Sequence, residues 1–428
     1  MRSLTRTRRG SARSLTPGVE TDSIRIVDMP DLGAVTEASS VVGEHLGSGR
    51  FSASSLRKYI RQNARDFGAR GDGVTDDTAA LRAAFGCGTP VYLSAGKYRV
   101  TGPVTVVANQ IVVADNVNAY DDPTTMPASV PITEIVADNA GGGFVSGDAV
   151  LTLNDRASIA GFAITSVANV DAVYAPGRFV RMERIYTRYG RHGANLNAVG
   201  PQVFACRFQS ASGHGIWGQS SCTDCLCVGV FVVGNGLSGA YFQDGIKHQL
   251  VGCTAEWNSS HGYEFYQGAS CALTSCASDR NNGAGLRLAS STNMSVVGSI
   301  FHRNGASGIA PAAHVSLGGV LSSLSFSGNT YRAFNSMDDL SGTPIPAYSF
   351  YVEPGMTLTN SVFADPMVPG TAAFFNSTIS DALVRPFFLV SAGDTPGRYA
   401  NDAGAAANGV EVGCVYIDTA GIFRQRVA

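Results

Sequence analysis

A glycine that recurs at nearly constant spacing is the feature that most constrains how this chain can fold. Successive members lie about 23 residues apart, a period within the range of solenoid repeats. They are Gly193, Gly215, Gly239, Gly262, Gly285 and Gly308. Each is followed by a short run in which apolar side chains alternate with others, and no helical period lies between them. Such a repeat indicates a solenoid, whose units bury their apolar side chains by stacking on one another.

An asparagine stands four residues before each of the last four glycines. These residues are Asn235, Asn258, Asn281 and Asn304. Asparagine tolerates the left-handed backbone of a tight turn. Stacked asparagines can also hydrogen-bond from one layer to the next. We therefore predict a structural ladder of these four side chains.

A unit of about 23 residues with short strands and Asn/Gly turns is typical of one coil of a parallel β-helix. A leucine-rich repeat is excluded because its leucine pattern is absent, and a β-propeller because its blades need about 40 residues or more. Within each coil, we expect Ile216, Tyr263, Phe265, Leu286 and Leu288 to point inward, because side chains alternate along a strand.

The chain has nine cysteines, most of them in the repeat region. Cys206, Cys253 and Cys276 stand nine residues before repeat glycines, so we interpret them as an internal ladder of small apolar side chains. Cys222 and Cys225 form a C-x-x-C, but the second close pair of a zinc ribbon or finger is missing. We therefore expect no metal site and no cofactor. The same holds for His192, His214 and His261, which precede turn glycines and are expected to stack.

The segment before the coils carries a family resemblance. Residues 66–85 read DFGARGDGVTDDTAALRAAF, and residues 90–100 read PVYLSAGKYRV. This opening resembles that of the pectate-lyase-like superfamily of right-handed β-helix proteins, which includes polygalacturonases and many bacteriophage tailspikes. Asp76 and Asp77 stand where a helix N-cap is wanted, before an apolar stripe, which predicts a short capping helix. We assign Asp72, Asp76 and Asp77 to turns and caps rather than catalysis.

Two further segments resemble parts of phage tail proteins. Residues 24–60 are similar to amino-terminal anchoring modules, and residues 409–428 are similar to the endings of tail and spike chains. The resulting expectation is an all-β chain built on a right-handed single-stranded parallel β-helix with a capping helix. We divide it into a flexible basic tail (1–22), a virion-anchoring module (23–62), a β-helix (63–310, with the capping motif at 66–100) and a β-rich tip or trimerisation region (311–428).

The resemblance also implies partners and a location. Such spikes are usually homotrimers on the virion that bind host capsule or lipopolysaccharide, and many cleave it. The amino-terminal module would then contact tail or capsid proteins, after assembly in the host cytoplasm. The net charge of −2 provides no field for nucleic acid. Because the sequence contains no long apolar run, we expect neither Sec export nor membrane insertion.

Two outward columns of the coils carry the candidate chemistry. Six residues before each glycine lie Thr187, Gln209, Val233, Glu256, Asp279 and His302. The carboxyl groups of Glu256 and Asp279 are expected about 5 to 7 Å apart, near the separation used for glycosidic cleavage by two carboxylates. The next position carries Trp257, Arg280 and Arg303, where the tryptophan can stack on a sugar and the arginines can bind an acidic one.

The second column lies two residues after each glycine. It contains Asn195, Trp217, Tyr241, Glu264, Arg287 and Ala310. We interpret it as a sugar-binding strip, against the alternative that Glu264 and Arg287 form only a cross-strand ion pair. No outward cluster of acids suggests a Ca²⁺-dependent lyase, so hydrolysis or plain binding is favoured over elimination.

Three functions remain open from the sequence. The first is a virion spike that binds host polysaccharide, with or without hydrolysis at Glu256 and Asp279. The second is an adhesive or structural spike without turnover, mounted on a tail or a capsid. The third is a stand-alone bacterial polysaccharide hydrolase or lyase.

Overall fold

The computed structural model describes residues 62–114, 132–305, 313–332, 346 and 348–365 with their side chains. It also gives the backbone of β1 (Ser40–Val42), β2 (Arg50–Ser52), β38 (Ala373–Phe375), β39 (Ala382–Val384), β40 (Arg398–Tyr399), β41 (Val415–Asp418) and β42 (Phe423–Gln425). The chain divides into two compact units, residues 1–60 and 61–428. The predicted basic tail lies outside the described residues. In the predicted anchoring module, the antiparallel pair β1–β2 is described.

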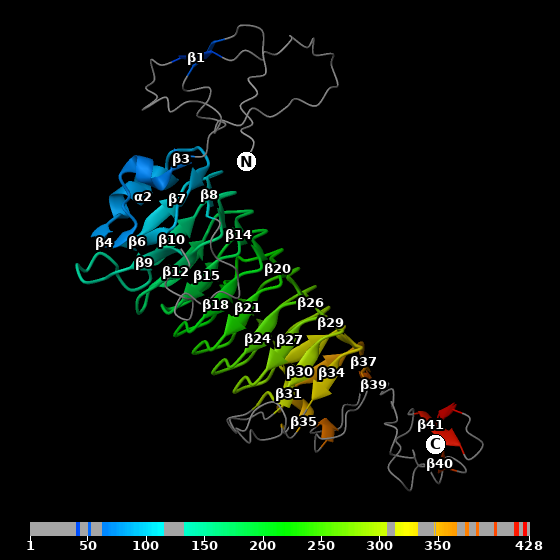
Figure 1. The fold of residues 1–428 in the computed structure, drawn as a ribbon. Coiled ribbons are helices and arrows are strands. Elements are labelled where there is room, and N and C mark those ends of the chain that lie inside the picture. The colour runs from blue at the N-terminus through cyan, green and yellow to red at the C-terminus, as the bar shows by residue number, and fades with distance from the viewer. Residues whose placement is uncertain are drawn as a thin grey trace, which may run out of the picture. The chain divides into compact units, whose positions relative to one another are not determined.

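The second unit is built from three long sheets whose strands follow one another in rotation along the chain (Figure 1). Neighbouring strands within each sheet are parallel and come from successive coils, so one circuit of the chain contributes one strand to each sheet. The described strands number 13 in sheet 1 and 11 each in sheets 2 and 3. This arrangement confirms the predicted parallel β-helix.

The strands of sheet 1, besides β39, have the following bounds. They are β3 (Gln62–Asn63), β5 (Val91–Tyr92), β8 (Ile111–Val113), β11 (Ser158–Ala160), β14 (Arg181–Glu183), β17 (Gln202–Phe204), β20 (Leu226–Val228), β23 (Gln249–Val251), β26 (Ala272–Thr274), β29 (Ser295–Val297), β33 (Ser325–Ser327) and β37 (Ser361–Ala364).

The other two sheets follow the same order. Sheet 2 contains β4 (Asp72–Asp76), β6 (Gly96–Val100), β9 (Thr133–Ala137), β12 (Ala163–Thr165), β15 (Tyr186–Arg188), β18 (Arg207–Gln209), β21 (Phe231–Val233), β24 (Thr254–Glu256), β27 (Ala277–Asp279), β30 (Ile300–His302) and β34 (Thr330–Arg332). Sheet 3, besides β38, contains β7 (Val104–Val106), β10 (Ala149–Leu153), β13 (Asp171–Ala175), β16 (Ala194–Leu196), β19 (Ile216–Gly218), β22 (Ala240–Gln243), β25 (Tyr263–Tyr266), β28 (Leu286–Ala289), β31 (Ala313–Gly318) and β35 (Tyr348–Val352).

The coils extend beyond the predicted boundary at residue 310. Strands β31, β33, β34, β35, β37, β38 and β39 continue the same three sheets. Strands β32 (Val320–Ser322) and β36 (Thr357–Thr359) form a separate parallel pair. The predicted end came too early because the later coils are longer than the repeat, as the pairing of Val296 with Phe326 and then Phe363 shows. Residues 398–425 contribute the separate three-stranded sheet β40–β41–β42.

The capping segment forms as expected. Helix α2 (Thr78–Phe85) follows a 3-10 turn, η3 (Ala64–Phe67), and buries Leu81, Ala84 and Phe85. The acids before it are structural: Asp76 accepts the amide hydrogen of Thr78. The carboxylate of Asp77 accepts from the amides at positions 70 and 71 instead of capping the helix with its side chain. Hydrogen bonds from the amides of the turn it closes hold the pKa of Asp72 at about 2.

The predicted asparagine ladder is present, and all four side chains are fully buried. In each step, the side-chain nitrogen donates to the next oxygen: Asn235 to Asn258 at 2.9 Å, then on to Asn281 at 2.8 Å and to Asn304 at 2.8 Å. The backbone N–H of each residue donates to that same oxygen. Layer-to-layer hydrogen bonding is therefore the reason for asparagine here.

The expected left-handed conformation falls one residue earlier than predicted. Gly234, Trp257, Arg280 and Arg303, each directly before a ladder asparagine, have φ values between 50° and 63°. The repeat glycines meet a different constraint, which is close stacking. A Cβ at Gly239 would stand 2.6 Å from the carbonyl oxygen of Gly262 in the next coil.

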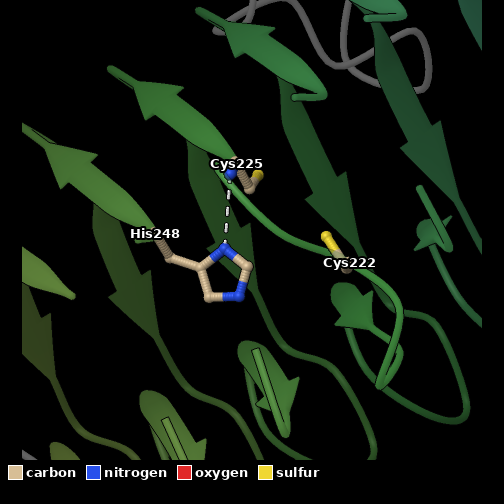
Figure 2. Close-up of side chains that lie close together, drawn as sticks. All are labelled: Cys222, Cys225 and His248. Atoms are coloured by element: carbon tan, nitrogen blue, oxygen red, sulfur yellow. Dashed lines mark hydrogen bonds between the residues drawn. The ribbon is translucent and has the colours of Figure 1, made fainter. Parts of the chain in front are cut away.

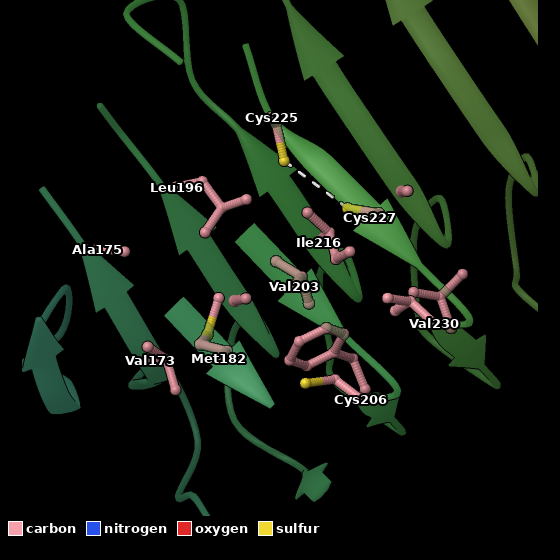
Figure 3. Close-up of a cluster of buried hydrophobic side chains, with 14 of the residues drawn as sticks. Val173, Ala175, Met182, Leu196, Val203, Cys206, Ile216, Cys225, Cys227 and Val230 are labelled. Atoms are coloured by element: carbon pink, nitrogen blue, oxygen red, sulfur yellow. Dashed lines mark hydrogen bonds between the residues drawn. The ribbon is translucent and has the colours of Figure 1, made fainter. Parts of the chain in front are cut away.

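The interior is one continuous apolar cluster, part of which Figure 3 shows. The residues predicted to point inward, such as Ile216 and Phe265, are buried. Cys206, Cys253 and Cys276 are also buried, and the amide of Cys253 donates to the sulfur of Cys276 at 3.4 Å. Burial raises the pKa of the Cys206 thiol to about 12, so this thiol is protonated at neutral pH. The predicted internal ladder is confirmed.

None of the helices in the described parts of the chain has the length and apolar character needed to cross a bilayer.

Candidate functional site

The first predicted column lies on the outer face of sheet 2. The pairing of strands places Gln209, Val233, Glu256, Asp279 and His302 side by side in successive coils. The prediction was wrong for Thr187, which is fully buried and pairs with Phe208. Arg188 occupies the outward position beside Gln209, because the turn between Arg188 and Gly193 is one residue shorter than the corresponding turns in later coils.

Asp279 is the centre of an ion cluster. Its carboxylate accepts from Nη1 of Arg280 at 2.7 Å, and from Nη2 and Nε of Arg303 at 2.9 and 3.2 Å. Nδ1 of His302 lies 3.5 Å from the same carboxylate. Arg303 is only 2% exposed, so Asp279 neutralises a cation that is almost removed from water. We refer to Glu256, Trp257, Asp279, Arg280, His302 and Arg303 as the Asp279 cluster.

The left-handed backbone at Trp257 and Arg280 contributes to the arrangement of this cluster. Trp257 leaves 51% of its surface exposed, and the guanidinium carbon of Arg280 lies 4.7 Å from the centre of its indole. A cation over an indole face is attracted by the ring quadrupole. The result is a half-exposed aromatic surface next to an acid–arginine network, which is a suitable surface for a carbohydrate ring.

Glu256 differs from its neighbour. Burial raises the pKa of Glu256, and the negative charge of Asp279 raises it further. Among the described residues, no hydrogen bond or ion pair to the Glu256 carboxyl group is present, whereas Asp279 is held by two arginines. Two adjacent carboxyl groups with unequal surroundings can act as a proton donor beside an anion.

The second predicted column lies on the outer face of sheet 3. Asn195, Trp217, Tyr241, Glu264 and Arg287 are paired in sequence by the strand register. Ala310 lies outside the described residues. The residue paired with Arg287 on the following strand is Ser316, so the prediction for Ala310 was wrong because that coil carries a longer turn.

An ion network closes one end of this column. Arg287 donates to Glu264 at 3.0 Å and to Glu353 at 3.0 Å, and Ser238 donates to Glu264 at 2.6 Å. The predicted cross-strand pair is therefore present as part of a larger network. Sequence reasoning missed Glu353, which stands 66 residues after Arg287 in a region where the glycine repeat is no longer visible.

Aromatic rings cover the other end. His192 and His214 stack with ring centres 5.5 Å apart, as expected, and their rings lie 4.8 Å from Trp217 and Tyr241 respectively. Burial lowers the pKa of His214 to about 4 and that of His192 below its usual value, so both imidazoles are neutral at pH 7. A neutral aromatic surface is well suited to stacking on sugars.

A group of possible metal ligands lies elsewhere, inside the β-helix. Cys222, Cys225 and His248 are buried, and one ligand atom from each lies within 4.8 Å of the others. Sequence reasoning missed His248, because the partner of the C-x-x-C was expected in a second close pair. The fold supplies it by stacking, since His248 takes the position equivalent to Cys225 in the next coil.

Two families match parts of the chain. The family described as "Right handed beta helix region" matches residues 192–345, and "Rhamnogalacturonase A/epimerase, pectate lyase-like" matches residues 61–154. The chain has the fold of a right-handed parallel β-helix, and each of the two matched regions is similar to the family named for it. Sequence relatives of this β-helix protein include Mannuronan C5-epimerase AlgE5 of Azotobacter vinelandii, 58% identical over 45 residues. That match spans 9% of the chain and 4% of the epimerase.

Solved structures share the fold of this β-helix protein at low sequence identity. The A-module of the Azotobacter vinelandii mannuronan C-5 epimerase AlgE4 matches with a TM-score of 0.54 and 16% identity, over 76% of this chain and 99% of the module. Tailspike protein 2 from the Escherichia coli O157:H7 bacteriophage CAB120 matches with a TM-score of 0.57 and 12% identity, over 84% of this chain and 50% of the tailspike.

Proposed function

We propose that this protein is a virion spike of a phage or phage-like particle that binds host surface polysaccharide. The observation that carries the proposal is the aromatic and charged column Trp217–Tyr241–Glu264–Arg287 on one outer face of a β-helix similar in fold to a phage tailspike. Aromatic rings beside fixed charges bind sugars by stacking and hydrogen bonding at once.

We further propose that the Asp279 cluster hydrolyses the bound glycan. Glu256, with its raised pKa and unoccupied carboxyl group, would protonate the leaving glycosidic oxygen. The oxygens of Asp279 already accept from Arg280 and Arg303, so this carboxylate would stabilise developing positive charge on the sugar rather than attack it. A water molecule would attack the anomeric carbon instead, and the carboxylate left on Glu256 after it protonates the leaving oxygen would take the proton of that water. Trp257, half exposed beside Glu256, would hold the adjoining sugar ring.

A second candidate is a stand-alone polysaccharide-modifying enzyme. It is favoured by the local match to a mannuronan C5-epimerase and by the fold shared with an epimerase module over 99% of that module. In this case the arginines of the outer faces would bind a polymer of acidic sugars. Homotrimerisation, and anchoring on a tail or capsid through residues 23–62, belong to the spike proposal.

The test combines binding with product analysis. The purified chain is incubated with capsule and lipopolysaccharide from candidate hosts and with mannuronan, and we measure co-sedimentation, shorter oligosaccharides and epimerised residues. Trp217→Ala should weaken binding at least tenfold. Glu256→Gln should abolish chain cleavage without weakening binding. Gln249→Ala on the outer face of sheet 1 is the matched surface control and should change neither.

The outcomes separate the candidates. Binding without shorter products would identify an adhesin, and cleavage that survives Glu256→Gln would place the reaction elsewhere. Epimerised mannuronan would favour the second candidate. Failure of every polymer to bind, with a monomer in light scattering, would overturn the spike proposal.

A further inference from the structure

The group formed by Cys222, Cys225 and His248 has no part in the outer faces discussed above. All three side chains are fully buried in the described β-helix, and Figure 2 shows them close together, with the His248 ring facing the backbone nitrogen of Cys225. The two cysteines belong to the turn that precedes β20, and His248 precedes β23 in the next coil. A buried polar side chain normally has a hydrogen-bond partner, so each member needs an explanation.

The stacking of coils brings the group together. The bridge between Thr223 and Ile246 aligns the two turns, which places Cys225 and His248 at equivalent positions. Gly245 then makes room for the imidazole, because a Cβ at this position would overlap Nε2 of His248. Cys222 holds the position equivalent to Gly245 one coil earlier, so its side chain projects beside the space into which the ring fits.

The imidazole is left with weak polar contacts. Its Nδ1 accepts the amide hydrogen of Cys225 at 3.4 Å, which is longer than a strong N–H···N bond, and Nε2 is buried without a partner among the described residues. Burial lowers the pKa of His248 to about 4, so the ring is neutral. In the tautomer that fits the hydrogen bond, the lone pair of Nδ1 faces the backbone amide of Cys225 (Figure 2), so a metal bound at Nδ1 would replace this long bond.

The distances suit a tetrahedral thiophilic metal after a small contraction. With metal–sulfur bonds of about 2.3 Å and metal–nitrogen bonds of about 2.0 to 2.1 Å, ligand atoms around zinc are about 3.5 to 3.8 Å apart. The atoms of this group lie within 4.8 Å of one another, so a shift of about 1 Å in side-chain positions would close them on an ion. A further thiol lies beside the group, because the sulfur of Cys227 is 3.7 Å from that of Cys225.

We propose that Cys222, Cys225 and His248 bind one Zn²⁺ ion inside the β-helix, with Cys227 or a water as fourth ligand. With water as the fourth ligand, binding would convert the thiols of Cys222 and Cys225 to thiolates and release two protons, so that the ion and its ligands are neutral overall. With Cys227 as the fourth ligand, a third proton would leave and the site would carry a charge of −1, which the apolar interior disfavours. A neutral site fits an apolar interior, where an unpaired charge is expensive. The metal would link two consecutive coils and would therefore stabilise the folded β-helix.

The test uses cobalt as a spectroscopic probe. The full chain is expressed in minimal medium supplemented with Co²⁺ or Zn²⁺ and purified under reducing conditions, because a buried site must fill as the chain folds. We expect one equivalent of metal per chain. The cobalt protein should show the sulfur-to-metal charge-transfer and intense ligand-field bands of tetrahedral thiolate coordination. This spectrum tests the proposal on the wild-type chain, independently of any variant.

Matched variants locate the ion. Cys222→Ser and Cys225→Ser should lower bound metal at least tenfold and abolish the cobalt bands. Cys276→Ser is the control. The ladder position of Cys276 accepts serine in the next coil, where Ser299 stands, so this variant should fold and retain one equivalent of metal. Circular dichroism confirms that each variant is folded. Wild-type protein without metal or thiolate bands, or a Cys222→Ser/Cys225→Ser double variant that keeps the metal, would overturn the proposal.

Discussion

Removal of one step of the asparagine ladder should destabilise the β-helix strongly. The side chain of Asn258 takes part in four hydrogen bonds: it accepts from the backbone and side-chain nitrogens of Asn235, and it donates to Asn281 and to the carbonyl oxygen of Val232. In Asn258→Ala, the amide of Asn235 stays buried and loses its acceptor. All of these groups lie where water cannot replace the missing partner.

The magnitude follows from the number of bonds. Each buried hydrogen bond contributes about 1 kcal/mol net, and an unpaired buried donor costs about 1 to 3 kcal/mol. The four bonds of Asn258 therefore predict a loss of about 4 kcal/mol in the free energy of unfolding. Asn258→Asp keeps the shape of the side chain but loses both donated bonds, so it should also be destabilised at pH 7 and recover part of the loss in acid, where a protonated carboxyl can donate.

The assay is guanidinium chloride unfolding followed by circular dichroism, with hydrogen exchange of the flanking coils read by mass spectrometry. Gln249→Ala, at an exposed position on sheet 1, should stay within about 0.5 kcal/mol of wild type. If Asn258→Ala differs from Gln249→Ala by less than about 1 kcal/mol, the ladder does not stabilise the coils as we infer.

Three further predictions concern the charged and aromatic surfaces. Because the pKa of Glu256 is raised in the folded state, ionisation of this carboxyl group lowers the free energy of unfolding as pH rises. Glu256→Gln should therefore be more stable than wild type at pH 7 and equally stable below about pH 4, where the carboxyl group is protonated in both the folded and the unfolded state. Melting curves at the two pH values measure this difference. Arg303→Met should lower the free energy of unfolding by about 3 kcal/mol, because the buried guanidinium donates two hydrogen bonds to Asp279. A double-mutant cycle with Asp279→Asn should show strong coupling between the two residues, and additive effects would contradict this. His214, with a pKa of about 4, binds protons more readily when unfolded, so stability should fall as pH drops from about 6.5 toward 4; an NMR titration that places its midpoint near 6.5 would refute the assigned burial.

The repeat made much of this structure predictable, because identical side chains at a fixed spacing must stack once the chain coils. The asparagine ladder, the buried cysteines and the inward Phe265 all follow from that rule. The same rule failed where turn length changed: a turn shorter by one residue put Arg188 rather than Thr187 on the outer face.

Contacts between coils were also harder to foresee than contacts within the repeat. Glu353 reaches Arg287 across 66 residues, and His248 meets Cys225 from a coil without a motif of its own. In both cases the partners are neighbours only after stacking, and sequence spacing alone does not distinguish such a pair from two unrelated polar residues.

The interchangeability of the coils has a consequence for how such a protein changes length. Asn235, Asn258 and Asn281 present the same donor and acceptor to the layers on either side. Removal of the segment from one asparagine to the next would leave matching faces to rejoin. Each coil therefore adds about 4.8 Å to the length of the β-helix. Insertion or deletion of whole coils would shift the segments that follow along the axis without changing the contacts between the remaining coils.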